Sequence, residues 1–262
     1  MDAVTTSGEN ALAPADTLRG EWARFGAFLK WPKLPDRAPM PRVSSLVAVM
    51  RMLLLDFTFM AILLGIAGIA MAVGTELPQT ALSGMEMTPL IIFAAVVAAP
   101  LLEEIAFRGW LSGRPGHVLG WLLLGGAVVG VGVAGLAGGA PSGAAKTGIA
   151  FAGLGVLVAI VAAILAIVLL RKRDAMRWFQ RIFPLFFWLS TLAFSIVHIF
   201  NFPPDQMVMA LPLVLPQFAT GMILGYLRVN YGLWASILLH FLHNAAFIGM
   251  VVLASGAGKA AS

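Results

Sequence analysis

Long apolar stretches with almost no charge constrain this 262-residue chain more than any other feature. Hydrophobic residues make up 60% of the chain and charged residues 11%, and the mean hydropathy is +0.93. A helix of about 20 apolar residues is long enough to cross the hydrocarbon core of a bilayer. The sequence therefore predicts an all-α membrane protein, a bundle of seven or eight transmembrane helices, and not a soluble domain.

Seven segments have the length and composition of membrane spans. We expect them at about 45–74, 89–113, 118–139, 148–170, 183–201, 208–227 and 231–254. They would form one helical domain over 45–254, between an N-terminal tail of residues 1–44 and a C-terminal tail of residues 255–262. Pro212 and Pro216 should kink the sixth span, because proline cannot donate a backbone hydrogen bond.

Lysine and arginine flank one side of these spans. Arg37 and Arg42 precede the first span, a basic run covers 171–181 between the fourth and fifth, and Arg228 follows the sixth. Positive residues favour the cytoplasmic side, so we expect an integral protein of the inner (cytoplasmic) cell membrane with a cytoplasmic N-terminus. The net charge of +5 is explained by these flanks and does not indicate nucleic-acid binding. The absence of cysteine excludes thiol catalysis and disulfides.

The N-terminal tail contains a short amphipathic pattern. Leu18, Trp22, Phe25 and Leu29 fall at helical spacing, and proline-rich sequence follows over 32–41. The pattern predicts an interfacial helix lying on the membrane surface. A mobile tail is the alternative.

Three polar clusters interrupt the apolar spans, although a charged group near the bilayer centre costs several kcal/mol. A helix rise of 1.5 Å per residue places all three about 14–24 Å from the cytoplasmic ends of their helices. We therefore expect one buried polar site built from three helices. Its members are Glu103, Glu104 and Arg108, then Phe194 and His198, then His240 and Asn244.

Helix geometry indicates which of these side chains can pair and which chemical role suits each. Residues four apart share a helix face, so Glu104 and Arg108 can form an ion pair, while Glu103 points elsewhere and suits a general base. His240 and Asn244 also share a face. The imidazole can donate a hydrogen bond or bind a metal, and the amide can donate to an oxyanion.

In this order on separate helices, Glu-Glu-x-x-x-Arg, Phe-x-x-x-His and His-x-x-x-Asn resemble the CPBP family. This family comprises the CAAX prenyl endopeptidases and the bacteriocin-processing or immunity proteins also called Abi. The resemblance implies an intramembrane endopeptidase that cleaves a membrane-associated or lipidated peptide or protein. The segment 118–170 departs from the family pattern as an inserted hairpin without Asp, Glu or His, in which Gly126 and Gly130 have the spacing for close helix contact.

The resemblance also implies roles for the site residues. Glu103 would activate water with the help of His198, while Glu104 and Arg108 would order the site. Phe194 would pack against His198 or the substrate. His240 and Asn244 would stabilise the oxyanion or contribute to a metal site, and Zn²⁺ held by Glu103, His198 and His240 would keep one open position.

Other readings remain open from the sequence. The same residues could belong to a non-catalytic immunity or scaffold member of the family, to a small proton-coupled transporter, or to a structural polar network. Asp56, in the first span, should pair with a polar group on another helix, because an isolated carboxylate in the membrane is costly.

Overall fold

The structure, a computed structural model, describes residues 15–80, 85–137 and 143–260. Every regular element in these ranges is helical. Within the described residues, seven helical segments are long and apolar enough to cross a membrane, so the predicted fold class is confirmed. They are Val43–Ala72, Pro89–Ser112, Pro115–Val133, Ala152–Leu169, Phe183–Asn201, Pro204–Asn230 and Leu233–Leu253.

Several spans are built from more than one helical element. The first span is one helix, α2 (Val43–Ala72). The second joins α3 (Pro89–Phe93), a π-helical turn η1 (Ala94–Ala98), α4 (Ala99–Arg108) and a 3₁₀ turn η2 (Gly109–Ser112). The remaining large helices are α5 (Pro115–Ala137), α6 (Gly143–Leu169), α8 (Phe183–Val197), α10 (Leu215–Asn230) and α11 (Leu233–Ala260).

Short elements complete the chain at the two ends of the bundle. At one end, α1 (Leu18–Lys30) precedes the first span and α7 (Arg177–Arg181) precedes α8. After α8, the chain passes through η3 (His198–Asn201), η4 (Pro204–Gln206), α9 (Met207–Ala210) and η5 (Leu211–Val214). The predicted sixth helix is thus broken near Pro212, as expected. The helix α11 continues past the last span through residues 255–260, which the sequence assigned to the C-terminal tail.

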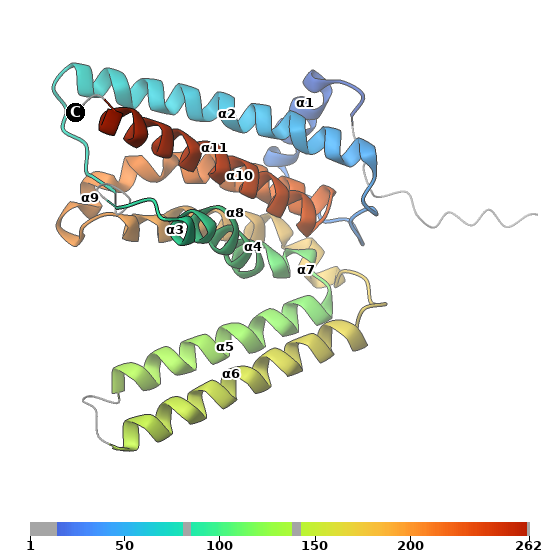
Figure 1. Cartoon of the computed structure of the whole chain (residues 1–262). Helices are drawn as coiled ribbons and strands as arrows, with labels where there is room; N and C mark the ends of the chain where they lie inside the picture. The colour runs from blue at the N-terminus through green and yellow to red at the C-terminus, as the bar shows by residue number, and fades with distance from the viewer. Residues whose placement is uncertain (1–14, 81–84, 138–142, 261–262) are drawn as a thin grey trace, which may run out of the picture.

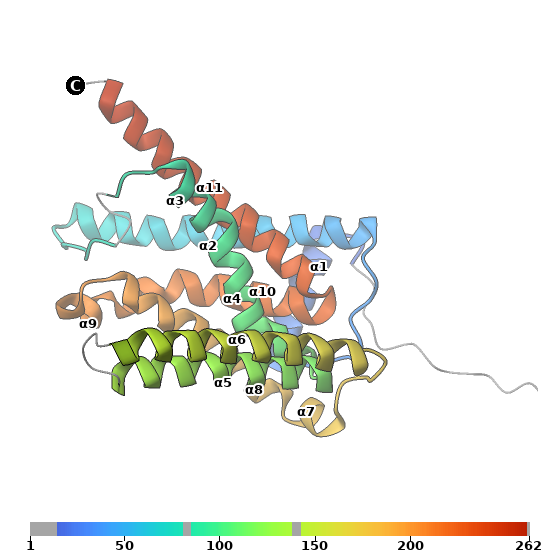
Figure 2. The same ribbon diagram turned by 60° about the horizontal axis from the view of Figure 1, so that its bottom comes forward.

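The main bundle is organised around α10, which contacts α2, α8 and α11. The helix α11 runs beside the second span and contacts both η1 and α4 (Figure 2). Two glycines allow α10 to approach α8 closely. A Cβ atom at Gly225 would lie 2.7 Å from the Phe187 ring, and one at Gly221 would lie 3.1 Å from the Phe194 ring.

The N-terminal helix α1 forms where an amphipathic helix was predicted, and part of its apolar face packs against the bundle. Phe25 and Phe28 are buried and pack edge-on against Tyr226 of α10. Glu21 is fully buried and accepts hydrogen bonds from the hydroxyls of Tyr226, at 2.7 Å, and Tyr231. The buried carboxylate thus anchors α1 to the end of α10.

The inserted hairpin stands apart from the main bundle (Figure 1). Its helices α5 and α6 contact each other, and α5 also contacts η2. At the base of the hairpin, Arg114 Nε donates to the carbonyl of Arg173 at 2.9 Å. The predicted close contact through Gly126 and Gly130 is wrong, because a Cβ atom at either position would meet open space. The close approach to α6 occurs at Gly116, where a Cβ atom would lie 2.7 Å from the Ala166 carbonyl oxygen.

Candidate active site

A π-helical turn precedes the two adjacent glutamates of the second span and exposes a backbone acceptor. The N–H of Ala99 bonds the carbonyl of Ala94, five residues back. It therefore does not bond the carbonyl of Ala95, its partner in a regular α-helix. The next donor along the chain would be Pro100, which has no N–H. The Ala95 carbonyl is thereby open to Asn244 of α11, whose Nδ2 donates to it at 2.8 Å. This bond ties the two helices together just beside the glutamates.

Glu104 lies at the centre of the buried polar group and has no exposed surface. Its Oε1 atom accepts from Arg108 Nη1 at 2.8 Å, which confirms the predicted ion pair. The same oxygen lies 3.0 Å from Nδ1 of His240. A carboxylate only accepts hydrogen bonds, so Nδ1 of His240 carries a proton. Glu104 therefore orients both a guanidinium and an imidazole.

Glu103 points away from Glu104 and retains contact with the surface, its side chain being 28% exposed. Its Oε2 atom lies 3.6 Å from Nε2 of His240. The imidazole thus lies between the two carboxylates, with one ring nitrogen toward each. Of the two glutamates, Glu103 is the one whose carboxylate is accessible without breaking the ion pair.

Phe194 and His198 come from the end of α8 and the first residue of η3. The Phe194 ring stacks beneath the Arg108 guanidinium, 3.8 Å from its carbon, and contacts the rings of His198 and His240 edge-on. His198 Nδ1 donates to the Phe194 carbonyl at 2.7 Å. This leaves Nε2 of His198 as the ring atom able to accept a proton.

The structure brings six of the seven predicted site residues together around Phe194 and Glu104. Asn244 lies one turn beyond His240, and its Nδ2 donates to the Ala95 carbonyl. Among the described residues, no three His, Asp or Glu side chains form a group with the spacing of a metal site. Zn²⁺ held by Glu103, His198 and His240 therefore stays a prediction from the sequence.

A second buried polar cluster lies one turn along α11 from His240. Asp56 of α2 is fully buried, accepts from the Thr220 hydroxyl at 2.7 Å and lies 2.5 Å from Nδ1 of His243. The predicted pairing of Asp56 with another helix is confirmed. The position of His243, three residues after His240, was a sequence signal that this side chain also faces a neighbouring helix.

Arg228 is a further residue that the sequence did not place at the site. This buried side chain of α10 donates from Nε to the Arg108 carbonyl at 2.8 Å and from Nη2 to the Gly109 carbonyl at 3.0 Å. These carbonyls end α4, where cationic side chains are favourable. Arg228 therefore holds the end of the helix that carries both glutamates.

Comparison with known proteins supplies the family. Neither a curated protein nor a solved structure matches the chain. Residues 85–246, more than half of the chain, match the family described as type II CAAX prenyl endopeptidase Rce1-like. The matched region contains all three polar clusters and the helices that position them. The chain therefore belongs to the Rce1-like family of type II CAAX prenyl endopeptidases, within the wider group that its motifs indicated.

Proposed function

We propose that this protein is an intramembrane endopeptidase that hydrolyses a peptide bond of a membrane-associated or lipidated substrate, using Glu103 to activate water. One observation carries the proposal: His240 lies between Glu104, which is occupied by Arg108, and the partly exposed Glu103. Two carboxylates in different surroundings can take different roles. Here one orders the site and the other is available as a base.

The reaction begins with a water held beside Glu103 and Nε2 of His240. Glu103 removes a proton as the water oxygen attacks the carbonyl carbon of the peptide bond. The resulting oxyanion needs hydrogen-bond donors; we assign this role to Asn244, whose Nδ2 has a second N–H besides the one bonded to the Ala95 carbonyl. The proton held at the site then passes to the leaving amine, with Nε2 of His198 placed to assist.

Glu104 and Arg108 act by fixing this arrangement. The Glu104 oxygen holds Nδ1–H of His240, which leaves the opposite ring nitrogen facing Glu103. Arg108 is fixed in turn by Glu104 and by the Phe194 ring. A preorganised polar group of this kind stabilises charge more strongly in a dry site than in water.

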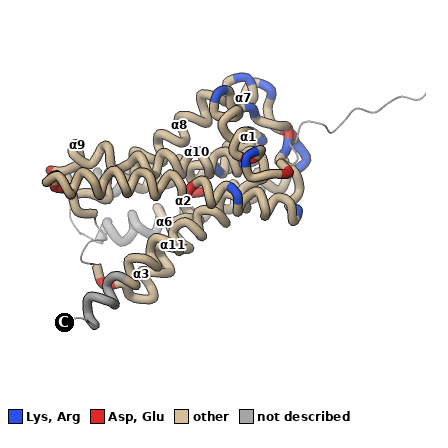
Figure 3. Tube along the Cα trace, turned by 90° about the horizontal axis from the view of Figure 1, so that it is seen from above, with Lys and Arg blue, Asp and Glu red and all other residues tan. Residues whose placement is uncertain are grey.

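The distribution of charge supports the orientation that we propose in the membrane. Lysine and arginine gather at the end of the molecule that carries α1 and α7 (Figure 3). This is the end that the positive-inside rule assigns to the cytoplasm. The N-terminus would then be cytoplasmic in the inner membrane, with the substrate approaching from that side.

The decisive test is Glu103→Gln, which removes the base but keeps the shape of the side chain. We expect the purified variant to fold normally and to cleave a farnesylated peptide with a CAAX terminus roughly 10²–10⁴-fold more slowly than the unaltered protein. Glu86→Gln, a change at an exposed carboxylate outside the site, is the matched control. Cleavage by Glu103→Gln at the normal rate would show that Glu103 is not the base.

The same assay separates the alternatives. A non-catalytic scaffold or immunity protein would bind the peptide without cleaving it. A proton-coupled transporter would show flux that Glu103→Gln abolishes, with no peptide product. Zn²⁺ bound by Glu103, His198 and His240 stays a prediction, which metal analysis of the purified protein and cleavage after chelator treatment would test.

A further inference from the structure

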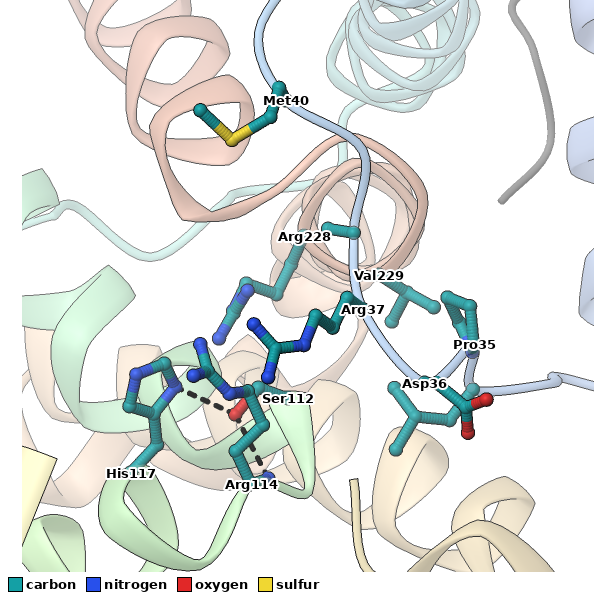
Figure 4. Close-up of a pocket in the computed structure, with 11 residues that line it drawn as sticks. Pro35, Asp36, Arg37, Met40, Ser112, Arg114, His117, Arg228 and Val229 are labelled. Atoms are coloured by element: carbon teal, nitrogen blue, oxygen red, sulfur yellow. Dashed lines mark hydrogen bonds between the residues drawn. The ribbon is translucent and has the colours of Figure 1, made fainter. Parts of the chain in front are cut away.

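A cavity of about 190 Å³ lies at the basic end of the molecule, separate from Glu103, His198 and His240. Its walls come from residues 34–40, from the turn between η2 and α5, and from the end of α10. Three arginines line it, Arg37, Arg114 and Arg228, together with Ser112 and His117. Figure 4 shows the three guanidinium groups pointing toward one another across this space.

Each of the three arginines is held in place by protein contacts. Arg228 bonds the carbonyls of Arg108 and Gly109. Arg114 bonds the carbonyls of Arg171 and Arg173, and Arg37 pairs with Asp174. The convergence of the guanidinium groups is therefore built into the fold.

The positive charge of the cavity is poorly balanced. Asp36 is the acidic member of the lining, but its carboxylate accepts from Gln180 at 2.8 Å and lies away from the guanidinium groups in Figure 4. Asp174, the partner of Arg37, is itself 59% exposed. Partial burial, followed by repulsion from Arg37, lowers the pKa of Arg114, although attraction to Asp174 opposes this shift. An anion in the cavity would relieve this crowding of like charges.

Polar groups of the turn add to the arginines. The Ser112 hydroxyl lies 2.8 Å from Nδ1 of His117 and accepts from the backbone N–H of Arg114 at 3.3 Å. Hydroxyl, imidazole and guanidinium groups can all donate to an oxyanion. Arginine in particular matches phosphate oxygens with two parallel hydrogen bonds.

The position of the cavity indicates the kind of anion. The second span ends at Ser112, the third begins at Pro115 and the sixth ends at Asn230, so the cavity lies at the level where lipid headgroups begin. We propose that it binds a phosphate group, carried by an anionic lipid headgroup or supplied as free phosphate. Arg228 lines the cavity and also bonds the carbonyls at the end of α4. This side chain would therefore connect the bound group to the end of that helix.

Thermal unfolding of the detergent-purified full chain tests the proposal. The protein is titrated with dioleoyl phosphatidic acid, with dioleoylglycerol, which lacks the phosphate, and with inorganic phosphate. We expect saturable stabilisation by phosphatidic acid and none by dioleoylglycerol. Arg114→Gln and Arg37→Gln should each weaken the apparent affinity roughly tenfold or more, since each removes a charged hydrogen-bond donor.

The matched control is Arg181→Gln, which removes the same charge from an exposed position on α7 outside the cavity. It should bind as the unaltered protein does. Stabilisation by phosphatidic acid alone would identify a lipid headgroup as the source, and equal stabilisation by inorganic phosphate would identify the free ion. Each variant is compared with its own unfolding temperature without ligand. The proposal is overturned if neither phosphate source stabilises the protein, or if Arg114→Gln and Arg37→Gln respond as Arg181→Gln does.

Discussion

Nδ1 of His240 and Nη1 of Arg108 share one oxygen of Glu104, at 3.0 Å and 2.8 Å. The two donors come from different helices, α11 and α4, so this carboxylate oxygen fixes how the helices meet. Since Nδ1 faces Glu104, Nε2 is left to face Glu103. The buried ion pair thus determines which nitrogen of His240 is available for chemistry.

Removing Arg108 should lower both stability and activity. Arg108→Ala leaves Glu104 charged and buried, and breaking a buried pair from one side costs about 3–5 kcal/mol. Glu104→Gln in the same chain removes the stranded charge, so the double variant should be less destabilised than the sum of the two single variants. Thermal unfolding of all four proteins gives the coupling free energy. Additive losses would show that the two side chains do not act as a pair.

The bond from Asn244 to the Ala95 carbonyl should depend on Pro100. Asn244→Ala leaves that carbonyl without its side-chain donor, with an expected loss of about 1–3 kcal/mol of unfolding free energy. Pro100→Ala restores a backbone N–H that can reach the carbonyl in a π-helical turn. Asn244→Ala should therefore cost less in the Pro100→Ala background. An equal cost in both backgrounds would contradict this account of the π-helical turn.

The cluster of Asp56, Thr220 and His243 should stabilise the contact between α2, α10 and α11. We expect Asp56→Ala to lower the unfolding temperature most, because it strands both partners. Thr220→Val should have the smallest effect, since it removes one hydrogen bond. Peptide cleavage should also fall in Asp56→Ala, because α11 carries His240. An Asp56→Ala protein as stable as Thr220→Val would show that the cluster contributes little.

The hydrogen bonds to Glu21 should hold α1 on the bundle. Tyr226→Phe keeps the ring but loses a hydrogen bond to a charged acceptor, with an expected cost of about 1.5–3 kcal/mol. Cleavage by added protease in residues 31–42 should then become faster, whereas Arg19→Gln, an exposed change on α1, should leave it unchanged. A protease-cleavage rate in Tyr226→Phe equal to that of Arg19→Gln would argue against the anchor.

The same anchor predicts a dependence on alkaline pH. Burial, followed by the bond to Glu21, raises the pKa of Tyr231. A raised pKa favours the protonated hydroxyl in the folded state, so the stabilisation is fully present below pH of about 10, the ordinary tyrosine value, and is lost as the pH rises further. The unfolding temperature of the unaltered protein should therefore fall as the pH rises above about 10. In Tyr231→Phe, which has no hydroxyl to ionise, the unfolding temperature should lack this contribution to the fall.

Hydropathy and helix spacing predicted the features of the fold that depend on local sequence alone. The seven spans follow from runs of apolar residues, and the Glu104–Arg108 pair follows from their separation by four residues. Matched depth correctly predicted that the clusters around Glu103, His198 and His240 meet. These features depend on helix rise and composition, which are the same in any bundle.

Features that depend on how helices are rotated against one another were missed. The spacing of Gly126 and Gly130 is the same as that of Gly116 and Gly120, yet only the second pair faces α6. Asp56 and His243 are 187 residues apart, so no local pattern links them. The role of Glu21 was also hidden, because a carboxylate on an amphipathic helix is usually solvated.

The closed base of the α5–α6 hairpin has a consequence for how such proteins can diverge. Because Arg114 bonds the backbone of Arg171 and Arg173, the chain leaves the main body and returns to it at nearly the same point. Two crossings are added together, so every later helix keeps its direction. A hairpin of this kind can change in length or sequence without altering the direction of the helices that carry the polar site. The lateral surface of the protein can therefore vary while the site in the bundle stays the same.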